Sequence, residues 1–453
     1  MGALLFHSTN DQSPAVNLRE ALLTGQAPDR GLYLPKGFPR LTDEEIAAFA
    51  DLPYREIAFR VLSPYTQDVI EPHVLSAMCA DAYNFEVPLE KVYDRVHVMR
   101  LDRGPTASFK DFAARMMARL MGHFLRADGR QLTILTATSG DTGSAVAHAF
   151  HKVPGIRVIV LFPFAEVSTS QRKLMTTLRD NVRTIAVDGK FDDCQAMVKR
   201  AFADPDLKHH SLSSANSINI GRLLPQSVYY FYAAARLAKP GESVVFAVPS
   251  GNFGDMMGAV VAEQMGLAVR KLIAPVNDND AFPRFLASGR YEKVVPSRNS
   301  LSNAMNVGHP SNLARLVALY GGQMDETGKI HRMPDLAAMR QELFSSAVSD
   351  ERTRQTIKAV WDKYQLLLEP HGAVAWRGFE DWQECESLNG LPAVVLETAD
   401  PAKFPEEIEK NMGWSPDVPP AMAAAIQLPE DYDTMKADYE ELRAYLLTTS
   451  LRF

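Results

Sequence analysis

One lysine stands where a helix is expected to begin, in surroundings that could make it a nucleophile. Lys110 belongs to the segment 104–111, Gly-Pro-Thr-Ala-Ser-Phe-Lys-Asp, in which Ser108 and Asp111 can satisfy free amide donors at a helix start. Partial burial and the positive end of the helix dipole would both favour the neutral amine, which is the form that attacks a carbonyl group. The alternative is a lysine whose stem covers the core while its ammonium reaches water.

The helix that follows has one apolar face by its periodicity. Lys110 falls at the edge of this face, which consists of Phe109, Phe112, Ala113, Met116, Leu120 and Phe124. Asp111, Arg115 and Arg119 fall on the opposite face, away from the expected core.

Two further loops, each between an expected strand and an expected helix, have the composition of anion sites. Residues 138–143, Thr-Ser-Gly-Asp-Thr-Gly, combine two glycines with three hydroxyls, and residues 249–255, Pro-Ser-Gly-Asn-Phe-Gly-Asp, place glycines around Asn252 and Phe253. Glycines let the backbone approach a ligand, and amides at a helix start bind carboxylate or phosphate. An ordinary turn is the alternative for the first loop. Neither loop matches a dinucleotide or nucleotide-triphosphate motif.

A fourth loop, residues 216–222, carries a possible phosphate ligand. Ser217 and Arg222 lie near a helix start, and an arginine suits forked contacts with phosphate. A capped helix with a solvated arginine is the alternative. The two anion-type loops at 138–143 and 249–255, expected in one parallel sheet, indicate that two anionic groups bind in one cleft.

The elements that must position these loops alternate between short β-rich runs and helical patterns from about residue 96 onward. The expected strands cover 132–136, 157–162, 182–187, 243–248, 269–276 and 393–398, and the clearest helices between them cover 218–237 and 255–265. This alternation favours an α/β fold with a doubly wound, mainly parallel sheet, in which ligands bind beyond the carboxyl ends of the strands.

The two ends of the chain have a different texture. Residues 1–95 are expected to form a separate small domain with helices at 44–49 and 55–61, followed by a catalytic region over 96–410. Residues 411–453 are interpreted as a Pro- and Ala-rich linker, 414–429, and a terminal helix, 431–447.

Composition narrows the class of protein. With 453 residues and 46% apolar content, the chain can bury two or three cores, and its net charge of −7 with no basic block argues against nucleic acid as a partner. Three widely spaced cysteines, Cys79, Cys194 and Cys385, predict free thiols in a reducing cytoplasm and no structural zinc or other metal site. No apolar run is long enough to span a membrane, and the N-terminus does not read as a secretory signal.

Taken together, the four loops resemble the threonine synthase family, within the tryptophan-synthase-β-like group of pyridoxal phosphate enzymes of fold type II. Two more segments share the resemblance: Ala27-Pro28-Asp29 with Gly31-Leu32, and residues 398–405, Thr-Ala-Asp-Pro-Ala-Lys-Phe-Pro. The resemblance extends from near the N-terminus to about residue 405. It implies two α/β subdomains with doubly wound parallel sheets and an additional N-terminal domain.

The resemblance also implies roles for particular residues. Lys110 would bond the aldehyde of pyridoxal 5'-phosphate, Asp141 would lie near its phenolic oxygen, and Thr398 would donate its hydroxyl towards the pyridine nitrogen. The loop with Gly251, Asn252, Phe253, Gly254 and Asp255 would hold the cofactor phosphate. The substrate carboxylate would bind Ser139 and Thr142, and the substrate phosphate would bind Ser217 and Arg222. His371, in a segment that also matches, is interpreted as a packed, non-catalytic histidine.

The implied reaction is the conversion of O-phosphohomoserine and water to L-threonine and phosphate. Three alternatives stay open: a related phospho-lyase that releases a keto acid and ammonia, a serine or threonine dehydratase, and a catalytically silent homologue. The phosphate-type residues Ser217 and Arg222 disfavour the dehydratase, and the presence of Lys110 disfavours the silent homologue. The oligomeric state does not follow from the sequence.

Overall fold

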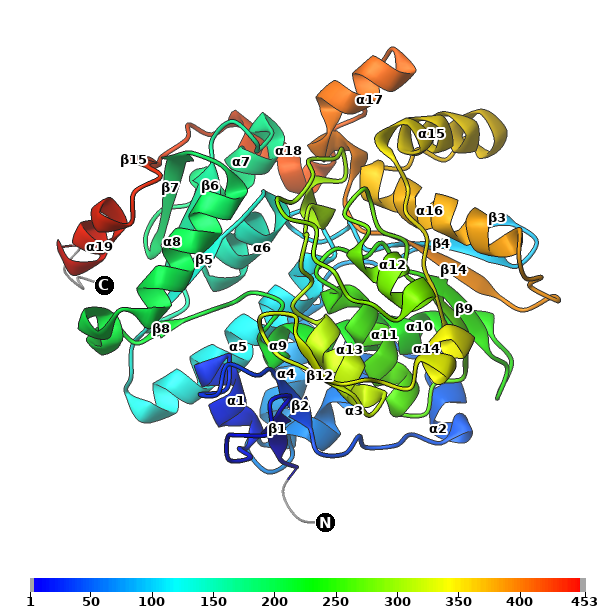
Figure 1. The fold of residues 1–453 in the computed structure, drawn as a ribbon, viewed down its shortest axis with the longest axis horizontal. Coiled ribbons are helices and arrows are strands. Elements are labelled where there is room, and N and C mark those ends of the chain that lie inside the picture. The colour runs from blue at the N-terminus through cyan, green and yellow to red at the C-terminus, as the bar shows by residue number, and fades with distance from the viewer. Residues whose placement is uncertain (1–3, 449–453) are drawn as a thin grey trace.

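Two mainly parallel sheets organise the chain (Figure 1), in a computed structural model that describes residues 4–448. The six-stranded sheet has the order β13-β10-β9-β14-β4-β3, and β3 alone pairs antiparallel to its neighbour. Its strands are β3 (Leu89–Tyr93), β4 (Val96–Arg100), β9 (Val244–Ala247), β10 (Val269–Ile273), β13 (Leu343–Phe344) and β14 (Ala393–Glu397).

The second sheet has five strands, all parallel, in the order β15-β7-β6-β5-β8. They are β5 (Leu132–Ala137), β6 (Ile156–Pro163), β7 (Val182–Asp188), β8 (Leu212–Ser213) and β15 (Asp433–Lys436). The expected α/β class with doubly wound parallel sheets is therefore confirmed.

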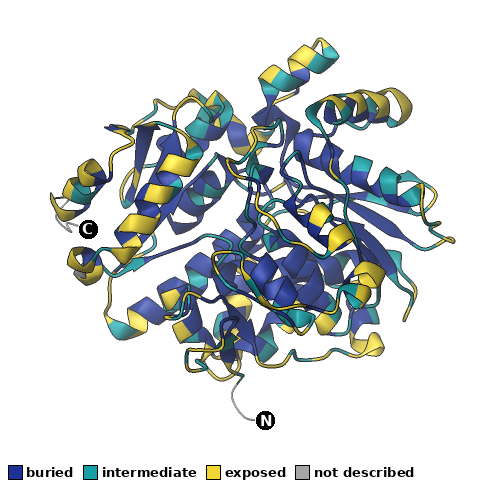
Figure 2. Cartoon of the chain, in the orientation of Figure 1, coloured by how far each residue is buried: buried dark blue, intermediate teal, exposed yellow. Residues whose placement is uncertain are grey.

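Helices cover both faces of each sheet. Successive residues of a strand point to opposite faces, so apolar strand residues on both faces are buried beneath helices. In β6, Val158 and Val160 join the main core, whereas Ile159 and Leu161 join a second cluster with residues of the helices at 191–203 and 439–448. The central strands β5 and β6, and likewise β9 and β14, are accordingly buried on both faces, whereas the edge strands β3 and β15 are more exposed and many yellow, exposed residues lie on the outer helices (Figure 2). The helices around the five-stranded sheet are α6 (Asp141–Phe150), α7 (Thr169–Thr176), α8 (Phe191–Ala203), α18 (Pro420–Gln427) and α19 (Tyr439–Thr448).

The six-stranded sheet is enclosed in the same way. Its helices are α10 (Ser227–Leu237), α11 (Gly254–Gln264), α12 (Ala281–Ser288), α13 (Leu313–Leu319), α14 (Leu336–Glu342), α15 (Asp350–Tyr364), α16 (Pro370–Gln383) and α17 (Pro405–Met412). The small hairpin of β11 (Gln323–Met324) and β12 (Ile330–Arg332) lies outside the sheet.

The N-terminal part packs on the helices that follow. It contains α1 (Leu18–Thr24), α2 (Asp43–Ala47), α3 (Tyr54–Thr66), α4 (Pro72–Ala82) and the antiparallel pair β1 (Phe6–Ser8) and β2 (Tyr33–Pro35). Helices near 44–49 and 55–61 are thus present. The domain limits at 95 and 410 stay predictions; β3, just before residue 95, hydrogen-bonds into the six-stranded sheet.

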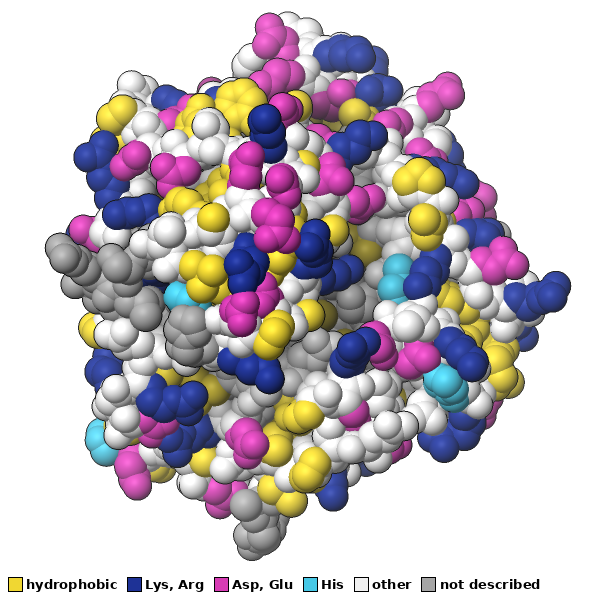
Figure 3. Space-filling view, turned by 60° about the vertical axis from the view of Figure 1, so that its left-hand side comes forward, with side chains coloured by type: hydrophobic (Ala, Val, Ile, Leu, Met, Phe, Trp, Pro, Cys, Tyr) yellow, Lys and Arg dark blue, Asp and Glu magenta, His cyan; other side chains and the backbone are white. Residues whose placement is uncertain are grey.

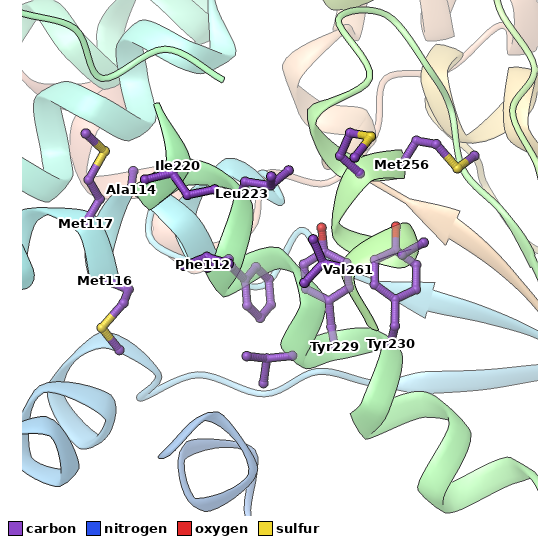
Figure 4. Packing of buried hydrophobic residues seen from close by; sticks show 14 of the residues in the cluster. Phe112, Ala114, Met116, Met117, Ile220, Leu223, Tyr229, Tyr230, Met256 and Val261 are labelled. Atoms are coloured by element: carbon purple, nitrogen blue, oxygen red, sulfur yellow. The ribbon is translucent and has the colours of Figure 1, made fainter. Parts of the chain in front are cut away.

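One core joins the helices that carry the candidate site. The long helix α5 (Lys110–Asp128) packs against α9 (Ile220–Leu223), and its Phe112 ring contacts Tyr229 of α10, while α11 packs against α9 and α10. The labelled side chains of Phe112, Leu223, Tyr229 and Val261 belong to this one core (Figure 4). This packing fixes the starts of three helices relative to one another.

Several element predictions were wrong in detail. The expected helix 218–237 is divided into α9, a 3₁₀ turn and α10, because Pro225 cannot continue an α-helix. The expected helix 431–447 is β15 followed by α19, and the expected linker contains α18. The strand expected over 269–276 ends at Ile273.

The charge of one face and the hydropathy of the helices are two separate features of the structure. On the face in Figure 3, basic and acidic side chains are intermixed. Among residues 4–448, no helix is both long and apolar enough to cross a membrane.

Candidate active site

The predicted site loops follow the carboxyl ends of strands from both sheets. Residues 104–109 follow β4, residues 249–253 follow β9 and residues 398–404 follow β14, all in the six-stranded sheet. Residues 138–140 follow β5 and residues 214–219 follow β8, in the five-stranded sheet. The loops from the two sheets contact each other through specific side chains.

Lys110 begins α5 and is buried, with its amine beside a carboxylate. Its Nζ lies 3.7 Å from Oδ2 of Asp141 and 4.6 Å from the ring centre of Phe109. Burial lowers the pKa of Lys110, although Asp141 opposes this change. The side chain is therefore buried, as the sequence predicts, and it does not reach outward to water.

Asp141 lies at the start of α6 between two lysines. Lys403 places its Nζ 2.7 Å from Oδ1 of Asp141, and Gln171 donates its amide to the same oxygen over 3.0 Å. Burial alone would raise the pKa of Asp141, but Lys403 and Lys110 hold it below the usual range. Asp141 is thus an ionised, fully buried carboxylate.

The predicted polar face of α5 was wrong for two of its three residues. Asp111 is buried and accepts hydrogen bonds from the amide of Thr106 at 2.8 Å and its hydroxyl at 2.7 Å. Arg115 is also buried, and its Nε donates to the carbonyl oxygen of Ala82 over 2.7 Å. Helix α4 covers Arg115, whereas the loop that precedes Lys110 covers Asp111, which fixes this loop instead of facing solvent.

The loops of Ser217 and Asn252 are joined directly. Asn252 Nδ2 donates to Oγ of Ser217 over 2.6 Å, and Ser311 donates its amide to Asn252 Oδ1 over 2.6 Å. Because the Ser217 oxygen already accepts a hydrogen bond, its hydroxyl proton is free to be donated to a ligand.

A buried arginine holds the same two loops from behind. Arg315 donates to the carbonyl oxygens of Ser217 at 3.2 Å, Ile218 at 2.6 Å and Tyr33 at 3.0 Å. It also donates to Asn312, whose amide in turn donates to the carbonyl oxygen of Asn252 over 2.9 Å. Residues 217–218 are therefore tied to β2 of the N-terminal part.

Arg222 is a buried guanidinium without an acidic ion-pair partner among the described residues. One nitrogen donates to the carbonyl oxygen of Ala215 over 2.7 Å, whereas Nε has no hydrogen-bond partner there. Burial lowers its pKa to about 10, so the group stays charged at neutral pH. A buried cation with unused donors is suited to an anionic ligand, and the alternative of a solvated arginine is wrong, since only 3% of Arg222 is exposed.

The start of α11 is open to an anion. Phe253, the N-cap residue, has a left-handed backbone with φ of +60° and makes no capping hydrogen bond through its side chain, so first-turn amides lack a side-chain acceptor. A Cβ at Gly251 would lie 2.8 Å from Cα of Met305, and one at Gly254 would lie 3.0 Å from Cβ of Ser217. Only glycine fits these positions without a shift of the neighbouring loop.

Asp255 turns away from this opening into the core. Its Oδ1 accepts hydrogen bonds from Tyr229 at 2.5 Å and Tyr230 at 2.7 Å. Burial raises the pKa of Asp255 to about 6. Its role in this structure is to join α10 to α11 beneath the loop.

Thr398 lies in a polar group at the end of β14. Its hydroxyl donates to Oε1 of Glu369 over 3.3 Å, and its carbonyl oxygen accepts from the amide of Phe109 over 2.9 Å. Glu369 caps α16 and also binds Nδ1 of His371 at 2.6 Å, while Nε2 of His371 accepts from the amide of Ala304. His371 is thus packed and fully hydrogen-bonded.

The two predicted carboxylate ligands remain accessible. Ser139 and Thr142 are partly exposed on either side of the α6 start, where no side chain caps the helix. The loop itself is stabilised by Thr138, whose hydroxyl oxygen accepts from the amides of Gly140 at 2.9 Å and Gly143 at 2.8 Å.

The sequence interpretation assigned no role to three buried residues at the site, Lys403, Glu369 and Arg315. Lys403 stands inside the segment 398–405 that was singled out, and Glu369 precedes Pro370 in the pattern of a helix start. Arg315 has no local signal, because its partners lie about 100 and 280 residues away along the chain.

Comparisons with known proteins show the family of the chain. Three family models match: pyridoxal-phosphate dependent enzyme over residues 85–398, threonine synthase N terminus over 5–83, and threonine synthase, C-terminal, over 372–446. The threonine synthase of Pseudomonas aeruginosa is 38% identical, with 97% of each chain covered, and that of Escherichia coli is 38% identical, covering 97% of this chain and 99% of that one.

The chain belongs to the threonine synthase family.

Solved structures of the family have the same fold. A threonine synthase from Brucella melitensis with bound pyridoxal phosphate superposes with a TM-score of 0.92 at 35% identity, covering 99% of this chain and all of that one. The Escherichia coli enzyme superposes with a TM-score of 0.87 at 37% identity, covering 98% and 99%. Like the rest of the threonine synthase family, this chain is a pyridoxal-phosphate-dependent lyase.

The residues of this threonine synthase fit the cofactor chemically. A buried amine of lowered pKa, Lys110, is available to an aldehyde, and the uncapped start of α11 with its obligatory glycines is available to a phosphate. Asp141 and Thr398 add a carboxylate and a hydroxyl from the two facing sheets.

Proposed function

We propose that the substrate is O-phosphohomoserine and that the products are L-threonine and phosphate. The observation that carries this proposal is the buried Arg222, which has no acidic ion-pair partner among the described residues and whose charge influences Lys110. The cofactor has a phosphate of its own, for which the start of α11 is available. A phosphorylated amino acid therefore requires a second anion site.

Pyridoxal phosphate, when bound, supplies an electron sink that stabilises negative charge next to the amino group of the substrate. We assign its attachment to Lys110 and its phosphate to the loop of Gly251, Asn252, Phe253 and Gly254. Asp255 would support this loop from the core through Tyr229 and Tyr230. Asp141 and Thr398 would contact the ring of the cofactor from opposite sheets.

The remaining steps follow from what the side chains can do. Ser139, Thr142 and the open amides of α6 would orient the substrate carboxylate. Lys110, once released from the cofactor, would remove and return protons at carbon atoms of the substrate. Its lowered pKa makes the neutral amine accessible for this proton transfer. Ser217 and Arg222 would bind the phosphate and stabilise its charge as it leaves, and water would then supply the hydroxyl of threonine.

Product analysis tests the proposal. The purified enzyme with pyridoxal phosphate is incubated with O-phosphohomoserine, and the products are separated by chromatography; equal amounts of threonine and phosphate are expected. The related phospho-lyase reaction would instead give phosphate with a keto acid and ammonia, and this result would overturn the proposal.

The free state of Cys79, Cys194 and Cys385 supports a location in the reducing cytoplasm, which we also propose. Fractionation of cells with an antibody to the chain tests this location.

A further inference from the structure

Asp141 lies between two buried lysines that it holds unequally. Lys403 Nζ is 2.7 Å from Oδ1, and it also donates to the carbonyl oxygen of Thr106 over 2.8 Å. Lys110 Nζ is 3.7 Å from Oδ2, and none of the hydrogen bonds among residues 4–448 has this nitrogen as its donor. One carboxylate therefore faces two amines, both buried.

The unequal contacts decide which amine keeps its proton. A buried ammonium is stable only when paired and hydrogen-bonded, and Lys403 has a short ion pair and a carbonyl acceptor. Lys110 has one longer ion pair and the face of Phe109. Among the described residues, Asp141 is the carboxylate within ion-pair distance of Lys110, and Lys403 holds it more closely, so the proton leaves Lys110 first.

We propose that Lys403 is a positioning residue whose ammonium neutralises Asp141 and so leaves Lys110 as the neutral amine that bonds the cofactor. This inference rests on the proposed attachment at Lys110. The lone pair of the amine nitrogen forms the bond to the aldehyde carbon, and the aldehyde oxygen leaves as water with both amine hydrogens. An ammonium has no lone pair for this step.

The surroundings of Lys110 are consistent with this role. The charged groups that face it from other elements are Asp141 on α6, Lys403 before α17, Arg222 on α9, Glu369 before α16 and Asp255 on α11. Burial lowers the pKa of Lys110 most, Asp141 opposes this, and Lys403 and then Arg222 reinforce it. Lys403 alone among these cations contacts Asp141 directly.

Lys403→Gln is the variant of choice, because the glutamine amide can still donate to Asp141 and Thr106 but carries no charge. The full-length holoenzyme is stripped of cofactor, and the rate at which added pyridoxal phosphate gains its lysine-bound absorbance is measured against pH. An uncompensated Asp141 would raise the pKa of Lys110, so we expect the midpoint to move up by about one pH unit or more. Attachment would be roughly tenfold slower at pH 7 and would recover at alkaline pH.

Three companion variants make the result specific. Lys403→Arg keeps the charge and should keep the wild-type midpoint. Lys271→Gln removes another buried lysine, which donates to the carbonyl oxygen of Gln341 away from the site, and should not move it. In an Asp141→Asn background there is no carboxylate to neutralise, so adding Lys403→Gln should give no further shift.

An unchanged midpoint in Lys403→Gln, or a shift in Lys403→Arg as large as that in Lys403→Gln, would overturn the inference. So would a rise in the midpoint when Lys403→Gln is added to the Asp141→Asn background, a comparison that stays measurable if the single glutamine variant does not fold. Failure of the proposed function looks different: the wild-type enzyme would then gain no lysine-bound absorbance or would form no threonine.

Discussion

At the scale of single residues, the site depends on buried charges that are incompletely paired. Arg222 has unused donors, Lys110 shares a carboxylate with Lys403, and Asp141 is ionised despite full burial. Leaving a buried charge without a full set of partners is costly in a structure that binds nothing. These residues are therefore arranged for ligands that carry complementary charge or that react with an amine.

Arg222 gives the residue-scale prediction. Arg222→Ala should lower kcat/KM for O-phosphohomoserine by about 100-fold or more, since it removes a preorganised donor to a leaving phosphate. Any slow turnover of an unphosphorylated analogue should be affected much less, and Arg222→Lys should recover part of the loss. Steady-state kinetics with both compounds measures this; equal losses with the two would contradict the assigned role.

At the scale of elements, strand-to-helix turns were predictable and the contacts between distant loops were not. Residues 138–143 and 249–255 have local glycine and hydroxyl patterns, so their place after β5 and β9 followed from the sequence. The burial of Asp111 and Arg115 did not, because helical periodicity gives only one buried face, whereas the loop before α5 covers Asp111 and α4 covers Arg115. Pro225 indicates the break between α9 and α10, but the apolar pattern of the segment obscured this signal.

Arg315 gives the element-scale prediction, since it ties residues 217–218 to β2. Arg315→Met should leave three carbonyl oxygens without their donor and lower the free energy of unfolding by about 2–4 kcal/mol. Loosening of Ser217 should also raise KM for the phosphorylated substrate while the cofactor absorbance persists.

Denaturant unfolding and steady-state kinetics measure the two effects of Arg315→Met. Arg340, an exposed arginine that likewise donates to two carbonyl oxygens, those of Leu286 and Ala287 away from the site, is the control. Arg340→Met should leave KM unchanged. An unchanged KM in Arg315→Met, together with unchanged stability, would remove the proposed link between the N-terminal part and the site.

At the scale of the whole molecule, the candidate site is built from loops at the carboxyl ends of strands from both sheets. The alternation of strand and helix patterns in the sequence predicted the parallel α/β class. The expectation of a second sheet came from the resemblance. The strand β15 was missed because a four-residue edge strand between two helices, largely exposed, has no clear alternating pattern. Its pairing with β7 brings the C-terminal residues into the fold of the five-stranded sheet.

Leu442 gives the whole-molecule prediction. This residue of α19 is fully buried in the cluster against the five-stranded sheet. Leu442→Ala should therefore lower the free energy of unfolding by about 2–5 kcal/mol. The folded fraction should bind cofactor normally, because the cluster lies on the face of this sheet away from α6. Urea unfolding together with cofactor absorbance checks this, and a variant of unchanged stability would show that α19 is not part of the core.

The attachment of the cofactor is the central claim, and borohydride tests it most directly. Reduction of the full-length holoenzyme fixes pyridoxal phosphate on the amine that holds it, and peptide mapping by mass spectrometry locates the label. We predict that the label is on Lys110 alone. A label on Lys403, the other lysine at Asp141, on any third lysine, or on none would contradict the account.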